Sequence, residues 1–329
     1  MPTITAEAAM AMTISEVAAG HYLPHIEARR QPDTAYGYRS SIELHVLPRW
    51  GSLTLPEIDR DAVQEWVDAL AKTDAGPGGA WKAYKCLRQI VNWMVRKWAL
   101  YVARPTDGIE EPRRPAYRPE TLTQRRLKRL IRGMVGCRYE ATVILSAALG
   151  LRPGEAYYVK WEQVNWRTGL VPIRGSLQQV PGLVYESPVK TAKGERDLYL
   201  PAWALDRLHQ LWVEAGRPRG RIIGTAKPSA VARAVRRWIE AHRLPKVTMR
   251  NLRHTWATLA ATLGVTIELC AAMLGHTNVQ TCYRYYYALT AAAAKRAQRR
   301  VARGVLGKTC EDMYKGIQLA PPEALPMAA

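Results

Sequence analysis

The sequence predicts a mainly helical protein with a small β-sheet, arranged as an N-terminal helical domain followed by an α+β domain. Three observations predict this fold class. Apolar residues recur at helical spacing through residues 13–104. A proline-rich stretch follows at 105–120, and short strand-like runs then stand among further helical segments. The 329 residues, 48% of them hydrophobic, are enough for two domains with their own cores.

The first domain is expected to be a small bundle of helices. Residues 1–12 are small and weakly patterned, which predicts a loose start. Lys82, Lys85 and Arg88 lie among aromatic residues on and just before the last expected helix. They can meet the phosphates of DNA, although a solvated basic face is the alternative. The helical periodicity covers residues 17–26, 38–47, 63–70 and 83–98.

A linker is expected between the domains because residues 105–120 contain four prolines, which block helix continuation. The second domain is expected at 121–306, followed by a tail at 307–329. Strands are predicted at 170–173, 182–189 and 197–200, with a turn at 191–194 that joins the last two into a hairpin. Helices are predicted at 125–134, 139–149, from Pro153 onward, and at 204–215, 230–242, 250–263, 267–273 and 290–303.

The charge of the chain points to a polyanionic partner. Lys and Arg number 48 against 28 Asp and Glu, giving a formal charge of +20. This basicity is spread through segments of folded-domain composition, so nucleic acid is a better match than a membrane surface. Five scattered cysteines without a close pair indicate reduced thiols and a cytoplasmic protein. No histidine spacing typical of metal sites, glycine-rich phosphate loop, signal peptide or membrane-spanning run is found, so no metal, nucleotide cofactor or membrane is expected.

Two basic residues can serve phosphodiester cleavage without a metal. That reaction needs a nucleophile, cations placed against the phosphate, and an acid for the leaving oxygen. Arg152 follows Gly150 and Leu151 at the start of a helix, where its guanidinium can join helix-terminal amides around a phosphate. Lys190 lies near the predicted hairpin turn and can act as the general acid, a role for which Lys193 competes. Either residue taken alone is more often simply solvated.

Two later segments add a second cationic group and a nucleophile. Arg250, Arg253 and His254 are spaced i, i+3 and i+4, which places them on one face at the start of a helix. They form a credible anion site, with a solvated basic turn as the alternative. His276 follows the helix-ending Gly275. A cluster of tyrosines comes next, a pattern more often found in packing than in catalysis: Tyr283, Tyr285, Tyr286 and Tyr287.

Taken in this order, the segments resemble the catalytic domain of tyrosine recombinases, the phage integrase and Xer-type family, over roughly residues 121–305. That family has an arginine after Gly-Leu, a hairpin lysine, a His-x-x-Arg box, a Leu-Gly-His box and a tyrosine nine residues past the last histidine. Glu155 holds the family's acidic position, and Arg196 the basic one after the lysine. The matching family positions here are Arg152, Lys190, Arg253, His276 and Tyr285.

The resemblance implies a metal- and ATP-independent enzyme that cleaves and rejoins DNA. Tyr285 would attack a phosphodiester and form a 3′-phosphotyrosyl intermediate. Arg152, Arg253 and His276 would stabilise the phosphate, and Lys190 would protonate the leaving oxygen. Residues 13–104 would be the core-binding, SAM-like domain, with Arg196 and His254 as further DNA-binding residues. The implied partners are double-stranded recombination sites, a homotetramer on that DNA, and accessory DNA-bending factors; the implied source is a bacterium or phage.

One position departs from the family pattern. Arg250 stands where the family usually has the histidine of His-x-x-Arg. Arginine keeps a hydrogen-bond donor for phosphate, but it cannot act as a base near neutral pH. A catalytically impaired DNA-binding protein of the same fold is therefore one alternative. A type IB topoisomerase-like enzyme is the other, and the complete Leu-Gly-His box and the short N-terminal domain favour a recombinase over it.

Overall fold

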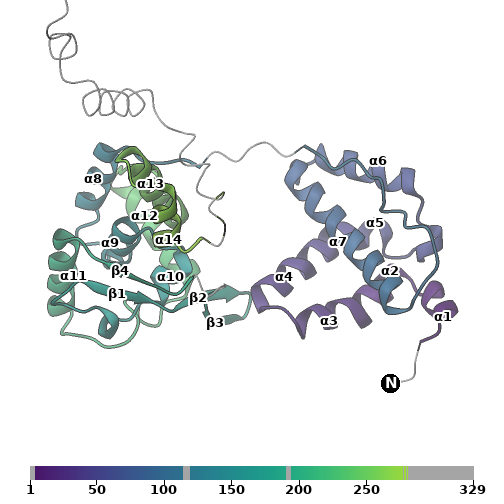
Figure 1. Cartoon of the computed structure of the whole chain (residues 1–329), viewed down its shortest axis with the longest axis horizontal. Helices are drawn as coiled ribbons and strands as arrows, with labels where there is room; N and C mark the ends of the chain where they lie inside the picture. Colours follow the sequence, from purple (N-terminus) through teal and green to yellow (C-terminus); the bar gives the residue numbers. More distant parts are fainter. Residues whose placement is uncertain (1–3, 114–118, 190–193, 277, 279, 281–329) are drawn as a thin grey trace, which may run out of the picture. The chain divides into compact units, whose positions relative to one another are not determined.

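The computed structural model describes residues 4–113, 119–189, 194–276, 278 and 280 (Figure 1). It divides the chain into two compact units. Unit 1 consists of Met1–Arg118 with Gln179–Val184, and unit 2 of Pro119–Gln178 with Tyr185–Ala329. Helices predominate in both units and the strands are few and short, so the predicted fold class is confirmed.

Unit 1 is a helical bundle in which the long helix α7 supplies much of the core. Trp50, Tyr84 and Leu87 are among its fully buried side chains, and α7 packs closely on α6. The helices are α1 (Ala6–Ala11), α2 (Ile14–Val17), α3 (Leu23–Glu27), α4 (Pro32–Ser41), α5 (Leu47–Trp50), α6 (Arg60–Ala71) and α7 (Gly76–Lys97), with a 3₁₀ turn at Leu55–Glu57 and π-helical turns at Ala18–Tyr22 and Ile42–Val46.

Both π-helical turns in unit 1 come just before a proline. A proline ring blocks the carbonyl four residues earlier, so the helix must widen there or break. The amide of Leu23, the residue immediately before Pro24, accordingly donates to the carbonyl of Ala18, five residues back. The same widening precedes Pro48. Because each helix widens instead of breaking, α2 continues into α3 through the first π-helical turn, and α4 continues into α5 through the second.

The structure departs from the sequence prediction at both ends of unit 1. The expected loose start contains α1, capped by Thr5, with Ala9 fully buried. Part of the expected linker packs on the unit: Thr106 is buried, and its carbonyl accepts a hydrogen bond of 2.9 Å from the Tyr84 hydroxyl. These contacts are long-range, and a proline count does not reveal them.

Unit 2 is built around α9, which is buried along nearly its whole length and packs on α10, α11 and α13 (Figure 1). Val171 and Ile173 from the strand Leu170–Ile173, and Leu198 from the strand Arg196–Tyr199, complete this core. The helices are α8 (Gln124–Gly133), α9 (Glu140–Leu149), α10 (Pro153–Tyr158), α11 (Ala202–Glu214), α12 (Pro228–Ala241), α13 (Met249–Thr262) and α14 (Ile267–Leu274), with a 3₁₀ turn at Trp161–Gln163.

The strands form two two-stranded sheets rather than the expected hairpin. β1 (Leu170–Ile173) pairs antiparallel with β4 (Arg196–Tyr199), and β2 (Gly175–Val180) pairs with β3 (Leu183–Pro188). The prediction that the last two strands pair is therefore wrong. β2 was not predicted because its Ser-Leu-Gln-Gln stretch lacks the apolar alternation of a half-buried strand. Across the described part of both units, no helix is long and apolar enough to cross a membrane.

Candidate active site

The junction of α9 and α10 places Arg152 at the edge of unit 2. Gly150 ends α9 with a φ of 63°, and a Cβ there would lie 2.9 Å from the Trp256 ring, so this position favours glycine. Pro153 then begins α10, as predicted, and Arg152 occupies its N-cap. The Arg152 side chain is 43% exposed, so it can reach both the protein interior and a ligand.

The carboxylate of Glu155 lies beneath the arginines and is 2% exposed. It accepts hydrogen bonds of 2.7 Å from the Arg152 side chain and 2.8 Å from Arg196, and the Arg253 guanidinium lies 3.8 Å away. Burial alone would raise the pKa of Glu155, but the arginines outweigh burial, Arg196 most strongly, and hold this pKa below its usual value. Glu155 is therefore ionised and partly neutralises a strongly cationic cluster.

The same arginines bind the C-terminal end of α14. Gly275 ends this helix with a φ of 65°, and the amide of His276 donates back to Ala271. The last carbonyls of this segment accept hydrogen bonds from side chains instead of from backbone amides. Each of three successive carbonyls accepts from a different arginine: Met273 from Arg196 at 2.6 Å, Leu274 from Arg253 at 2.6 Å, and Gly275 from Arg152 at 2.9 Å. We call these three side chains the arginine clamp.

His276 follows the clamped end of α14 directly. Its pKa is lowered to about 4, first because burial disfavours the charged ring and second because the positive charges of the arginine clamp lie close. His276 is therefore neutral at pH 7. A neutral imidazole can accept a proton, whereas the guanidinium groups beside it cannot.

A proton titration of His276 should show this lowered pKa. We expect the ring signals of His276 to titrate near pH 4 in the free protein, assigned by their loss in His276→Gln. Because the unfolded chain takes up this proton nearer pH 6.5, stability linked to His276 should fall as the pH drops from about 6.5 toward 4. A titration midpoint near pH 6.5 in the folded protein would contradict the clamp geometry.

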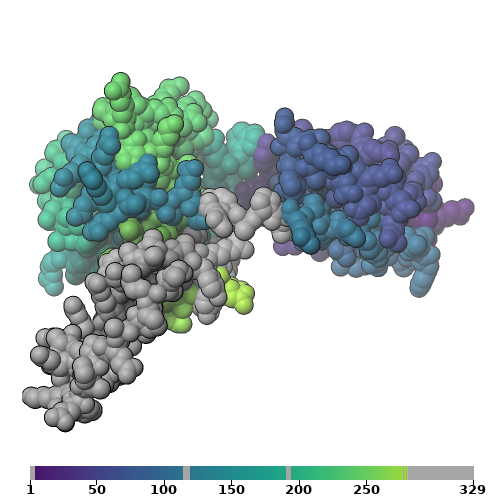
Figure 2. All heavy atoms as spheres, turned by 90° about the horizontal axis from the view of Figure 1, so that it is seen from above, coloured from purple at the N-terminus to yellow at the C-terminus, as the bar shows by residue number. Residues whose placement is uncertain are grey.

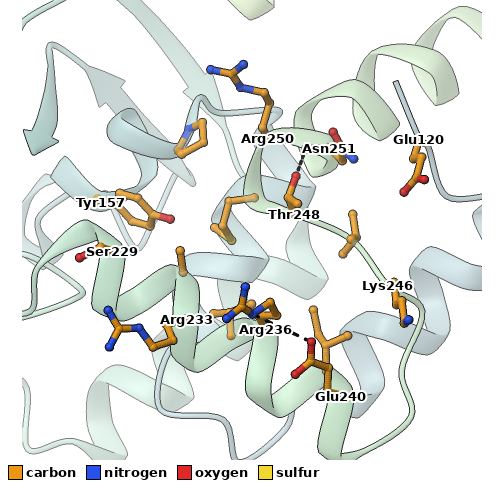
Figure 3. A pocket seen from close by; sticks show the side chains of 16 residues that line it. Glu120, Tyr157, Ser229, Arg233, Arg236, Glu240, Lys246, Thr248, Arg250 and Asn251 are labelled. Carbon is orange, nitrogen blue, oxygen red and sulfur yellow. Dashed lines mark hydrogen bonds and ion pairs between the residues drawn. The ribbon is translucent and has the colours of Figure 1, made fainter. Parts of the chain in front are cut away.

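Arg250 and His254 lie on the first turns of α13 but are not members of the arginine clamp. Arg250 is exposed and lines a pocket of about 640 Å³ with Pro153, Tyr157 and residues of α12. Figure 3 shows Arg250 on one side of this pocket, with Arg233 and Arg236 on the other. Arg253 points inward and is 7% exposed, so Arg250 and Arg253, although one turn apart on α13, lie in different surroundings.

His254 is half-buried beside these arginines. Its pKa is lowered, mainly by burial and then by the charges of Arg253 and Arg250. The remaining predicted catalytic groups, Lys190 and Tyr285, lie outside the described residues, as do the other three tyrosines of the cluster and the helix expected at 290–303. Within the described part of the chain, no three His, Cys, Asp or Glu side chains gather as a metal site requires.

Comparison with known proteins decides the family. The model of the phage integrase family matches residues 120–292, which include the whole arginine clamp, and the model of the phage integrase N-terminal SAM-like domain matches residues 16–71. The chain belongs to the phage integrase family. The resemblance read from the sequence is thereby confirmed.

Relatives within the phage integrase family cover most of the chain. A putative prophage phiRv2 integrase of Mycobacterium tuberculosis is 27% identical over 293 residues, which are 84% of this chain and 73% of the relative. The Tn1549 transposon integrase, solved in complex with transposon right end DNA, has a TM-score of 0.70 at 16% identity, covering 88% of this chain and all of that one. A lambda integrase tetramer bound to a Holliday junction has a TM-score of 0.63 at 15% identity, and the match covers 85% of this chain and 79% of that one. At such identities these structures show a shared fold.

In this phage integrase family member, α7 of unit 1 carries the basic residues singled out from the sequence. Lys82 is exposed, and Lys85 lies over the Trp81 ring at 4.5 Å. Both line a pocket of about 440 Å³ between α4 and α7. Arg88 is only half-buried, but its Nε is buried without a hydrogen-bond partner in the described structure, so its guanidinium is partly withdrawn from the surface.

A second basic helix of this family member was not singled out from its sequence. α8 carries five basic residues and no acidic one, and Figure 2 shows its blue-teal side chains beside the green ones of α12 and the residues after it. Like charges three and four residues apart repel each other, so this face favours an anionic partner. The absence of acids over one helical stretch was the signal available in the sequence. The five basic residues of α8 are Arg125, Arg126, Lys128, Arg129 and Arg132.

Proposed function

We propose that this phage integrase family member is a site-specific DNA recombinase of the tyrosine type, which cuts and rejoins double-stranded DNA. One observation carries the proposal: the arginine clamp gathers three guanidinium groups and the neutral His276 around one buried carboxylate. Three guanidinium charges and one carboxylate charge leave the site with a net positive charge, which favours binding of a phosphate. Because Arg152 is 43% exposed, a phosphate can reach its guanidinium from the solvent.

In the proposed reaction, Tyr285 attacks a phosphodiester of the bound DNA. A bond forms between the tyrosine oxygen and phosphorus, the bond to the 5′ oxygen breaks, and the product is a 3′-phosphotyrosine with a free 5′ hydroxyl. Lys190 gives a proton to the leaving oxygen. His276, neutral at pH 7, accepts the tyrosine proton, a task that Arg250 cannot perform. The energy of the broken bond is kept in the new link, so rejoining needs no ATP.

The proposed partners are double-stranded recombination sites and three further copies of the chain. The titles of the similar structures describe integrases on DNA, including a tetramer on a Holliday junction, which supports this assembly. Accessory DNA-bending proteins and a cytoplasmic site of action belong to the same proposal. The proposed domain organisation keeps residues 13–104 as the core-binding domain and 121–306 as the catalytic domain.

A nicked duplex carrying the repeat that flanks the host element tests the proposed function. The nick lets the short strand end diffuse away after cleavage, so a covalent protein–DNA adduct should accumulate in the presence of EDTA. The impaired-binder alternative predicts binding without an adduct. The topoisomerase alternative predicts relaxation of supercoiled DNA by a monomer that needs no such repeat.

Neutralising Lys82 should weaken DNA binding mainly through electrostatics. Removing one lysine–phosphate interaction lowers the slope of log affinity against log salt by about 0.9. We therefore expect Lys82→Gln to reduce this slope by about that amount, measured by titration of a fluorescent duplex from 50 to 200 mM salt, roughly the range over which such interactions are most visible. Lys72→Gln removes a matched exposed lysine at the end of α6 and should leave the slope unchanged. Equal slopes for the two variants would remove Lys82 from the DNA surface.

A further inference from the structure

The pocket that Arg250 lines, which we call the Arg250 pocket, carries more positive than negative charge (Figure 3). Four basic and two acidic residues line it, and its floor is mainly apolar, with Val235, Ile239 and Met249. Its volume of about 640 Å³ lies within the range of roughly 300–1,000 Å³ that is typical of ligand pockets. The pocket is therefore large enough for a ligand, and its charge favours an anion.

Tyr157 presents a hydrogen-bond donor to this pocket. The residue is 5% exposed, and its hydroxyl makes no hydrogen bond to any residue that the structure describes. Burial raises the pKa of Tyr157 to about 12, so the hydroxyl is protonated at pH 7 and can donate. Buried hydroxyls are normally hydrogen-bonded. A buried donor that faces a pocket and has no protein acceptor thus indicates a ligand with an acceptor atom.

The N-terminal end of α13 and two arginines add to this donor. The Thr248 side chain caps α13 by accepting from the Asn251 amide at 3.1 Å, so the amides of Met249 and Arg250 are left without an intrahelical partner. The start of a helix attracts anions through such amides. Arg233 and Arg250 are exposed, and neither makes a hydrogen bond or ion pair within the described part of the chain. Their guanidinium groups are available to a phosphate.

We propose that the Arg250 pocket binds a backbone phosphate of the DNA other than the one that is cleaved. The inference rests on the proposed function, in which the arginine clamp receives the scissile phosphate. Pro153 lines the pocket and directly follows Arg152 of the clamp, so one DNA strand can pass over both. Phosphates of one strand follow each other at about 3.4 Å along the helix axis. The apolar floor suits the deoxyribose beside the bound phosphate, and Arg250 anchors the DNA instead of replacing the absent histidine.

An intact duplex with one neutral methylphosphonate, moved through each position around the cleavage site, tests the proposal. Removing both partners of one contact should cost no more affinity than removing either. We expect Arg250→Gln to bind more weakly than wild type, with a slope of log affinity against log salt that is about 0.9 smaller. At one flanking position the methylphosphonate should weaken the wild type and leave Arg250→Gln unaffected, whereas at the scissile position it should weaken both proteins equally. Arg167→Gln removes an exposed arginine outside the pocket and should behave as wild type.

Tyr157→Phe should weaken binding of the duplex without changing this salt slope, because it removes a donor and no charge. A hydrogen bond to a charged group is strong enough that we expect a loss of about tenfold in affinity. The free energy of unfolding by urea should not fall in this variant, since the hydroxyl has no acceptor in the described structure to lose. A less stable Tyr157→Phe protein with wild-type affinity would show a structural role and overturn the inference.

The remaining outcomes separate this pocket from the clamp and from other ligands. If Arg250→Gln is unaffected by the methylphosphonate at the scissile position instead, Arg250 contacts the cleaved phosphate. Wild-type affinity in Arg250→Gln, or an equal loss in Arg167→Gln, would remove the pocket from the DNA surface. Inorganic phosphate titrated into the free protein should show no saturable binding; saturable binding that Arg250→Gln abolishes would identify free phosphate as the ligand. Each result overturns the inference alone, whereas a wild-type chain that neither binds nor cleaves its site would overturn the proposed function.

Discussion

Tyr285→Phe should form no covalent adduct with nicked DNA, while the wild-type protein accumulates one. Removing the hydroxyl deletes the nucleophile and changes nothing else in the ring, so the loss should be complete rather than partial. Affinity for an intact duplex should remain within about twofold, because neither the clamp nor the basic helices are altered. The measurement is a denaturing gel that resolves the free protein from its DNA-linked form.

The neighbouring tyrosines provide the controls for this prediction. Tyr283→Phe and Tyr286→Phe remove the same atom from adjacent positions of the cluster. Both variants should keep the adduct. If Tyr285→Phe still forms the adduct and one of these variants loses it, the spacing of nine residues from His276 has identified the wrong nucleophile.

Glu155→Gln should cost both stability and cleavage. The carboxylate is 2% exposed and neutralises a cluster of three arginines, two of which are themselves 7% exposed. Removing one partner of a buried ion pair typically costs about 3–5 kcal/mol, because uncompensated charge remains inside. We expect a loss of about that size in the free energy of unfolding by urea, and a cleavage rate reduced well beyond any loss of folded protein.

The stability of the wild-type protein should also depend on pH through Glu155. Its folded-state pKa is lowered, so its contribution is present above the ordinary carboxyl pKa and is lost as the pH falls through the lower folded value. Glu155→Gln should lack this part of the acid dependence. Glu140→Gln removes another carboxylate that is 2% exposed, so it should destabilise the protein without a specific loss of cleavage. Equal cleavage losses in the two variants would contradict the role given to Glu155.

Several features of the site could be predicted from the sequence because local rules determine them. Gly150 and Gly275 end α9 and α14 in the left-handed conformation that glycine favours, and Pro153 begins α10. These helix ends bring Arg152 close to His276, because Arg152 donates to the carbonyl of the preceding Gly275. Periodicity likewise predicted most of the described helices, though not α1, since each has an apolar face that must be buried.

The remaining features depend on contacts that no local pattern contains. The sequence showed that Arg253 is basic and near a helix start, but its burial depends on carbonyls of α9 and α14. Arg196 looks like a DNA contact until its acceptors are known. Strand pairing was misjudged for the same reason: β4 pairs with β1, across the whole length of β2 and β3. Positions where the sequence expectation failed are thus those that join distant segments.

The most direct test of the central claim is to identify the residue that becomes linked to DNA. The wild-type adduct is digested with trypsin and nuclease, and the modified peptide is sequenced by mass spectrometry. Cleavage after Arg284 yields a peptide that begins at Tyr285. We predict a nucleotide attached through its 3′ phosphate to Tyr285. The same mass on Tyr283, Tyr286 or Tyr287, or a wild-type protein that binds the site and forms no adduct, would contradict this account.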